Sequence, residues 1–174
     1  MKRPSLLVAA ALLLPAAALL TYYLYSETLL PTGYAVDELV VFKSQRRMEV
    51  YSAGRLLKTY TIALGQEPVG KKRFEGDMKT PEGVYTINDK NPNSSFHKNL
   101  GVSYPNADDC AYAASHGQSP GGLIKIHGLP NGHGEVGRFH HWGDWTHGCI
   151  ALTDAEIDEL YDAVSIGATI RIEP

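Results

Sequence analysis

The sequence predicts a mainly all-β domain, a β-sandwich or barrel with one or two short helices, preceded by an N-terminal apolar helix. Two observations carry this prediction. Short β-prone runs separated by turn residues recur along the chain, and only one segment shows a capped, amphipathic helical pattern. The 174 residues suit one domain with a short extension. We divide the chain into an export segment over residues 1–25, a linker over 26–36 and a folded domain over 37–174.

The composition excludes two classes of protein. The chain has two cysteines, so a disulfide-rich mini-protein is excluded and one bridge at most is available. The formal net charge is −3, whereas a nucleic-acid-binding domain normally carries a basic face. We therefore expect no nucleic-acid partner.

The N-terminus is typical of an export signal, because Lys2 and Arg3 precede an apolar run from Leu6 to Leu20. A cleaved signal peptide needs a small-residue site after this run, but Ala16 to Ala18 lie inside it. With the tyrosines that follow, the run approaches the roughly 20 residues that span a bilayer. We favour an uncleaved signal anchor over a cleaved signal peptide. Either alternative places the domain outside the cytoplasmic membrane, in the periplasm, and the anchor tethers it to that membrane.

The folded domain begins with a predicted meander of antiparallel strands. Turn residues at 43–46 and 52–55 separate the first three strands. A fourth run follows the turn at Thr80-Pro81-Glu82, a fifth ends by delivering His127, and a sixth closes the chain. The predicted strands are Leu39–Phe42, Met48–Tyr51, Leu56–Ala63, Gly83–Asn88, Leu123–Ile126 and Thr169–Ile172.

One helix is predicted directly from its signals. Thr153 and Glu156 form a capping box, and apolar residues then recur at i, i+3, i+4 and i+7 up to Val164. A weaker pattern predicts a second helix over Asp108 to Ser115.

Reactive side chains are concentrated before the capped helix. Six of the seven histidines lie between His116 and His147, and the segment ends in Thr146-His147-Gly148-Cys149. A histidine delivered from another strand could pair with Cys149 and lower its pKa. Consecutive backbone N–H groups at the glycine turn could hold an oxyanion. The alternative is a small buried core cysteine, and the residues alone leave the two open.

The histidines also raise the possibility of a metal hydrolase. The sequence contains neither an H-E-x-x-H motif nor a matched Cys/His spacing, so we do not favour that class.

His127-Gly128, a spacer and Thr146-His147-Gly148-Cys149-Ile150 resemble the signature of the YkuD-type L,D-transpeptidase catalytic domain. The resemblance covers residues 37–174, and the form of the cysteine motif is most similar to the YafK-like branch. Further segments that resemble the family are Val69-Gly70-Lys71, Glu75-Gly76-Asp77, Thr80-Pro81-Glu82-Gly83, Asn91-Pro92-Asn93-Ser94, Ser103-Tyr104-Pro105-Asn106, Pro120-Gly121-Gly122 and Asp144-Trp145-Thr146.

The resemblance implies catalytic roles for five residues. Cys149 is the nucleophile and His127 its general base, and the carbonyl of Gly128 orients the histidine ring. Backbone N–H groups around His147, Gly148 and Cys149 hold the oxyanion. The implied fold is a β-sandwich-like domain with a helix after the cysteine strand, which agrees with the strand pattern.

There are four substrate-binding candidates, and three of them have a plain structural alternative. Trp145 and Thr146 could line a peptide groove, although packing of a lid explains Trp145 equally well. Tyr104 could line the cleft or belong to the core. Many family members place Arg or Asn two residues after the cysteine, where this chain has Ala151. Arg138 is the candidate substitute, and a solvated loop arginine is its alternative.

The implied reaction is acyl transfer on peptidoglycan stem peptides through a thioester, giving a crosslink or attaching a protein such as a lipoprotein to the wall. It requires no metal and no organic cofactor. The nearest alternative is hydrolysis of the same acyl-enzyme, by an L,D-carboxypeptidase or by a hydrolase that releases a wall-bound protein. A non-catalytic wall-binding module is the third possibility, but the intact His127, Gly148 and Cys149 argue against it. The second cysteine, Cys110, reads as structural, or as one half of a regulatory bridge to Cys149.

Overall fold

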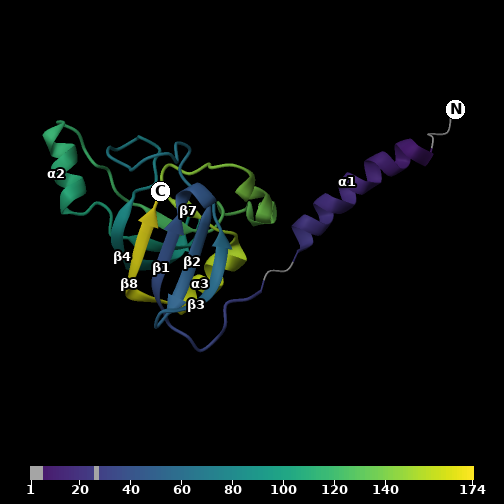
Figure 1. Ribbon diagram of the computed structural model, residues 1–174, viewed down its shortest axis with the longest axis horizontal. Coiled ribbons are helices and arrows are strands. Elements are labelled where there is room, and N and C mark those ends of the chain that lie inside the picture. The colour runs from purple at the N-terminus through teal and green to yellow at the C-terminus, as the bar shows by residue number, and fades with distance from the viewer. Residues whose placement is uncertain (1–5, 26–27) are drawn as a thin grey trace.

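One eight-stranded sheet forms the frame of the domain (Figure 1). The computed structural model describes residues 6–25 and 28–174, with side chains described for 13–25 and 28–174. The strand order is β3-β2-β1-β8-β4-β5-β6-β7. The strands are β1 (Val36–Phe42), β2 (Arg47–Ser52), β3 (Arg55–Thr61), β4 (Gly83–Ser94), β5 (His97–Val102), β6 (Lys125–His127), β7 (Ile150–Ala151) and β8 (Val164–Glu173).

The first and last strands of the domain lie side by side at the centre of the sheet. β1 pairs with β8 in parallel and with β2 in the antiparallel sense. Leu39 and Val41 of β1 are fully buried in the core, as is Ile170 of β8. The predicted runs around β1, β2, β3 and β8 therefore form strands, and the mainly β fold is confirmed.

The two ends of the sheet meet. Ala63, just after β3, forms an antiparallel bridge with Ala151 of β7, and Gly65 forms a parallel bridge with Thr146. The backbones of Ala63 and Ala151 exchange two hydrogen bonds, of 3.1 and 2.8 Å. The sheet consequently curls towards a barrel, and its closure lies beside the strand that follows Cys149.

The predicted capping-box helix is α3 (Asp154–Ala163). Thr153 accepts a hydrogen bond from the Glu156 N–H, and the Glu156 carboxylate accepts one from the Thr153 N–H. Ile157 and Leu160 are fully buried in the core. The helix packs against β5 and β6, so it supports the strand that ends at His127.

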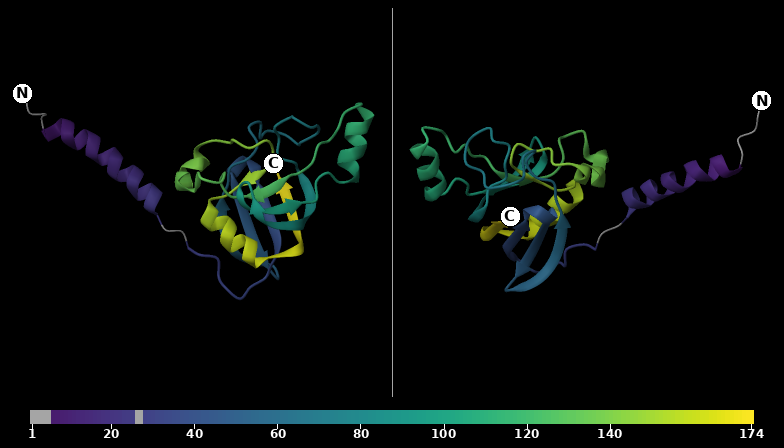
Figure 2. Two further views of the ribbon diagram at one scale, coloured as in Figure 1. Left: turned by 180° about the vertical axis from the view of Figure 1, so that it is seen from behind. Right: turned by 45° about the horizontal axis from the view of Figure 1, so that its top comes forward.

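The second predicted helix is also present, as α2 (Ala107–Ser115), with its own capping box from Asn106. It projects from the opposite side of the domain from α1 (Leu6–Leu24), as all the views show (Figures 1 and 2). The predicted strand Gly83–Asn88 forms the first half of β4, whereas the rest of β4, its hairpin partner β5 and the 3₁₀ segment η2 (Gly134–Trp142) were not predicted. A shorter 3₁₀ turn, η1 (Lys43–Gln45), links β1 and β2.

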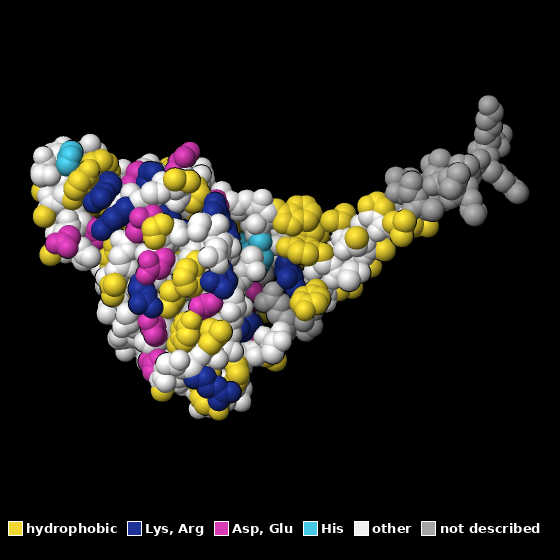
Figure 3. Space-filling view, in the orientation of Figure 1, with side chains coloured by type: hydrophobic (Ala, Val, Ile, Leu, Met, Phe, Trp, Pro, Cys, Tyr) yellow, Lys and Arg dark blue, Asp and Glu magenta, His cyan; other side chains and the backbone are white. Residues whose placement is uncertain are grey.

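The apolar N-terminal run forms α1, while the predicted flank of Lys2 and Arg3 lies outside the described residues. No helix among the residues that the structure describes is long and apolar enough to cross a membrane. The last turn of α1 meets η2, where Tyr23 stacks on Phe139 at 5.5 Å. Figure 3 shows hydrophobic side chains gathered at this junction.

The described part of the predicted linker, residues 28–36, lies against the domain. Leu30 is buried, and its backbone N–H donates a 2.7 Å hydrogen bond to the Glu159 carboxylate on α3. Val36 already belongs to β1, one residue before the predicted start of the domain.

Candidate active site

His127 is placed by the last position of β6 and is held there by its own backbone neighbour. The ring is buried, and Nδ1 donates a 2.7 Å hydrogen bond to the carbonyl oxygen of Gly128. A carbonyl can only accept, so the Nδ1 atom carries the proton and Nε2 presents a lone pair. This tautomer is the one that a general base needs.

Gly128 cannot be replaced without disturbing this arrangement. A Cβ atom built there would lie 2.7 Å from Oδ1 of Asp154 and 3.0 Å from side-chain atoms of His97 and Ile157. The turn after β6 therefore packs directly against the first turn of α3 and the start of β5. The close contact fixes the carbonyl that orients His127.

Cys149 precedes β7, which pairs in parallel with β6 in the register Ile126 with Ile150 and His127 with Ala151. Continuing this register sets Cys149 beside Lys125, two residues before His127. Because side chains alternate along a strand, Cys149 and His127 belong to the same face of neighbouring strands. The Cys149 thiol lies 3.7 Å from the carbonyl of Leu123 and is partly exposed.

Gly148, the residue before Cys149, must be a glycine because of its backbone conformation and because a side chain would not fit there. Gly148 has φ of +125°, and a Cβ atom there would lie 2.6 Å from the carbonyl oxygen of Lys79. The backbone approaches the segment after Met78 so closely that only glycine fits. This approach fixes the direction in which Cys149 leaves the turn.

Burial keeps both reactive groups neutral at rest. It lowers the pKa of His127 below 6.5, against the opposing effect of the Gly128 hydrogen bond. It also raises the pKa of the Cys149 thiol above 9.0, which the backbone N–H of Lys125 partly offsets. At neutral pH the resting pair is therefore a thiol and a neutral imidazole.

Thr146 organises the turn from within. Its buried hydroxyl donates to the Cys149 carbonyl at 2.8 Å and accepts from the Gly148 N–H at 3.1 Å. The Gly148 N–H is thus already hydrogen-bonded to the Thr146 hydroxyl. It can donate to an oxyanion only if that hydrogen bond breaks. The Thr146 side chain is buried and bonded within the turn. Its contact with a substrate therefore stays a prediction.

Asp144 fastens the same loop to the sheet. One carboxylate oxygen accepts from the buried backbone N–H of Leu64 at 2.9 Å, and the other accepts from the Arg46 guanidinium at 2.7 and 3.2 Å. Arg46 has φ of +47°, which lets the chain turn between η1 and β2 so that the guanidinium faces this loop.

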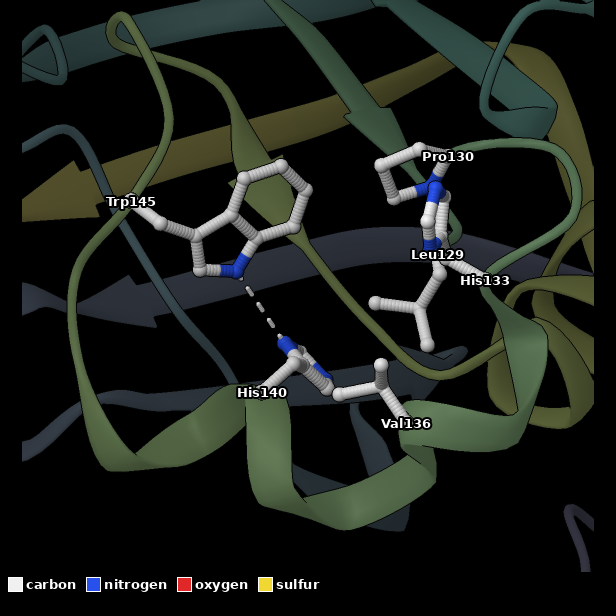
Figure 4. Close-up of a pocket in the computed structure, with 6 residues that line it drawn as sticks. All are labelled: Leu129, Pro130, His133, Val136, His140 and Trp145. Atoms are coloured by element: carbon white, nitrogen blue, oxygen red, sulfur yellow. Dashed lines mark hydrogen bonds between the residues drawn. The ribbon is translucent and has the colours of Figure 1, made fainter.

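Aromatic rings surround His127. Phe96 lies 4.6 Å from it, and Trp145 meets it edge-on at 5.7 Å. Beyond Trp145 opens a pocket of about 400 Å³, and η2 supplies part of its wall (Figure 4). The Trp145 indole N–H donates to Nδ1 of His140 across this pocket, at 3.4 Å. Its lining residues are Leu129, Pro130, His133, Val136, His140 and Trp145.

The other predicted residues are placed away from these rings. Tyr104 is buried in the core, stacks edge-on against Tyr85 and donates to the carbonyl of Pro120 at 2.9 Å. Arg138 directs its guanidinium over the rings of Tyr22 and Tyr25, 5.1 Å from each centroid. The structure therefore brings neither of them to His127. His147 is exposed on the turn before Cys149.

Ala151 is fully buried, and its backbone is hydrogen-bonded on one side to Ala63. The position where many relatives carry Arg or Asn thus offers no polar side chain.

Sequence reasoning missed Phe96, Asp144 as the anchor of the loop, and the backbone of Lys125. Asp144 was within a recognised segment, but its partner Arg46 is 98 residues away, and no local pattern connects them. Phe96 lies between β4 and β5, in the hairpin that was not predicted.

Fold and site together define a class: a curled, mainly β domain that presents a cysteine and a buried, carbonyl-oriented histidine on adjacent parallel strands. Residues 37–172 match the YkuD family, described as the L,D-transpeptidase catalytic domain. The chain belongs to this family. At family level, membership supports transpeptidation of peptidoglycan.

Individual relatives are also described as L,D-transpeptidases. "Putative L,D-transpeptidase YafK" of Escherichia coli K12 is 30% identical over 141 residues, covering 77% of this chain and 49% of that protein. The chain thus spans about half the length of the curated relatives it matches.

Among solved structures, the helical cell shape determining protein Pgp2 of Campylobacter jejuni is 26% identical with a TM-score of 0.62, over 90% of this chain and 54% of its own. An L,D-transpeptidase of Mycobacterium tuberculosis is 18% identical with a TM-score of 0.53, over 82% of this chain and 59% of its own, a likeness of fold alone.

Proposed function

We propose that this protein is a cysteine-dependent L,D-transpeptidase that acts on peptidoglycan stem peptides. The observation that carries the proposal is the 2.7 Å hydrogen bond from His127 Nδ1 to the Gly128 carbonyl. It leaves Nε2 as the base, on the strand next to Cys149. Family membership supplies the substrate class.

In the first step, His127 Nε2 accepts the thiol proton while the sulfur of Cys149 attacks the carbonyl of the L-centre. A C–S bond forms, the amide C–N bond breaks, and the terminal D-residue leaves as an amine that takes the proton from His127. In the second step, an acceptor amine attacks the thioester, loses a proton to His127, and the thiol is restored. Backbone N–H groups of the turn at Cys149 stabilise the oxyanion.

The alternative second step is attack by water. Ala151 favours it, because it removes a side chain that could hold a substrate carboxylate or backbone at this position. The products are then a shortened stem peptide, or a protein released from the wall.

The proposal is tested with the purified full-length chain and tetrapeptide muropeptides, with and without an amine acceptor, followed by mass spectrometry. Crosslinked product with release of the terminal D-residue is expected, and only shortened product indicates hydrolysis. Cys149→Ala should abolish both reactions, whereas Cys110→Ala, at an exposed free thiol on α2, should retain them. Unchanged turnover by Cys149→Ala would refute the thioester mechanism.

We further propose a location at the outer face of the cytoplasmic membrane, in the periplasm, where stem peptides are accessible. The apolar run of α1 supports tethering there. Attachment of a lipoprotein to the wall is one outcome of the second step, if the acceptor amine belongs to such a protein.

A further inference from the structure

A second group of metal-ligating side chains lies outside the cysteine–histidine pair. His140, His141 and Glu156 each offer one ligand atom, and these atoms lie within 4.8 Å of one another. The two histidines end η2, whereas Glu156 belongs to the first turn of α3. Two imidazoles and a carboxylate are a donor set that Zn²⁺ accepts in proteins, with a water in the fourth position.

His140 gives the independent sign that a ligand belongs here. The residue is 7% exposed, and its Nε2 atom is buried without a hydrogen-bond partner among the described residues. Buried polar atoms in native proteins are nearly always satisfied by protein, water or an ion.

Glu156 is suited to the same purpose. The residue is 6% exposed, and its capping contacts with Thr153 use Oε2. The two oxygens of a carboxylate offer about four lone-pair sites, so capping contacts and a metal bond can share one side chain. A buried carboxylate beside two imidazoles also gives the negative charge that attracts a dication.

We propose that His140, His141 and Glu156 form a Zn²⁺ site that links η2 to the first turn of α3. Ligand atoms around tetrahedral zinc are about 3.3 Å apart for bonds of 2.0–2.1 Å, so the side chains contract slightly around the ion. The linked segment is the wall of the pocket beside His127. Zinc therefore holds that wall in place, and the site does not depend on the proposed acyl transfer.

The Trp145 hydrogen bond supplies a spectroscopic signature. In the structure, Nδ1 of His140 accepts from the indole, so the neutral ring carries its proton on Nε2. Zinc at Nε2 requires that proton on Nδ1, and the indole N–H then loses its acceptor. Binding should therefore change the fluorescence of Trp145, which is read alone in a Trp142→Phe background.

The test is titration of metal-stripped, full-length protein with ZnCl₂ by calorimetry, with metal content measured after gel filtration. One Zn²⁺ per chain is expected, together with a rise in Tm and the change in Trp145 emission. Glu156→Gln keeps a capping side chain, and it and His141→Ala should each weaken binding at least tenfold and remove the rise in Tm.

Two matched variants separate this site from others. His133→Ala removes an exposed histidine of the same pocket, and Cys149→Ser removes the reactive thiol. Both should bind zinc as the unmodified chain does. Loss of binding in Cys149→Ser, full binding in Glu156→Gln and His141→Ala, or no binding to the unmodified chain would each overturn the proposal.

Discussion

At the scale of single residues, the site pairs two groups that are neutral at rest, the Cys149 thiol and the His127 imidazole. The environment of Cys149 disfavours a charged sulfur, and that of His127 disfavours a charged ring. In the proposed mechanism, reactivity at neutral pH therefore comes from proton transfer during attack on the substrate. A preformed thiolate–imidazolium pair would instead need a raised pKa at the histidine and a lowered one at the cysteine.

This arrangement predicts a slow reaction of the resting thiol with a small alkylator. The rate of alkylation of Cys149 by iodoacetamide at pH 7 should not exceed that of a free thiol, and it should still be rising above pH 9 because burial raises the thiol pKa. The measurement is mass spectrometry of the Cys110→Ser variant over a range of pH. A plateau of fast alkylation below pH 7 would indicate a thiolate at rest and contradict the prediction.

At the scale of elements, short strands and turns are held by contacts that link distant parts of the chain. β7 has two residues, and side-chain hydrogen bonds of Thr146 and Asp144 hold the turn before it. The carboxylate of Asp144 satisfies the N–H of the fully buried Leu64, which the end of β3 would otherwise leave unpaired.

Replacing Asp144 should therefore loosen the turn that carries Cys149. Asp144→Ala leaves the Leu64 N–H buried without an acceptor and should lower the free energy of unfolding by about 1–3 kcal/mol. Asp144→Asn keeps an acceptor oxygen but loses the charged pair with Arg46, so its loss should be smaller. Urea unfolding of both variants measures the difference. Equal stability of the two variants would show that the Leu64 contact contributes little.

These elements also mark how far the sequence could predict the structure. The Thr153 and Glu156 pattern predicts its helix because both capping partners are local. The strand ending at His127 follows from an apolar run and its turn. The pairing of β1 with β8, the β4–β5 hairpin and η2 were not predictable in this way. The β1–β8 pairing joins residues far apart in sequence, such as Val36 and Val164, and η2 packs aromatic rings against α1. The hairpin pairs nearby residues, but the strand pattern predicted only residues 83–88 of it.

The predicted substrate-binding residues show the same limit. Motif resemblance singled out the segments that contain Tyr104 and Trp145. It could not tell that Tyr104 points into the core while Trp145 faces His127. Side-chain direction at these positions is decided by packing against Tyr85 and Phe96, which lie in other elements.

At the scale of the whole molecule, two buried histidines couple stability to pH. Burial lowers the pKa of His127, and burial together with His141 and His127 lowers that of His140 to about 3. An unfolded chain binds protons at these rings near pH 6.5, whereas the folded chain does not. The unfolded state therefore takes up more protons as the pH falls below 6.5, and it gains stability relative to the folded state.

We accordingly expect the free energy of unfolding to decrease from pH 6.5 towards pH 4, in the presence of a chelator. His140→Phe should flatten this decrease, because it removes the ring whose pKa in the folded chain is lowered to about 3. Denaturant titrations at several pH values measure the slope, and His116→Phe on the exposed C-cap of α2 is the control. An equally steep loss in His140→Phe would assign the acid sensitivity to other groups.

The closure of the sheet has a consequence for how a peptide can reach Cys149. Both backbone hydrogen-bonding groups of Ala151 are taken by Ala63 on one side, and β6 occupies the other side. An incoming extended chain consequently cannot dock by β-augmentation at the strand after Cys149. We therefore expect the proposed peptide substrate to be recognised by loops and side chains, which can distinguish D-centres from L-centres, whereas a repeating main-chain ladder distinguishes neither.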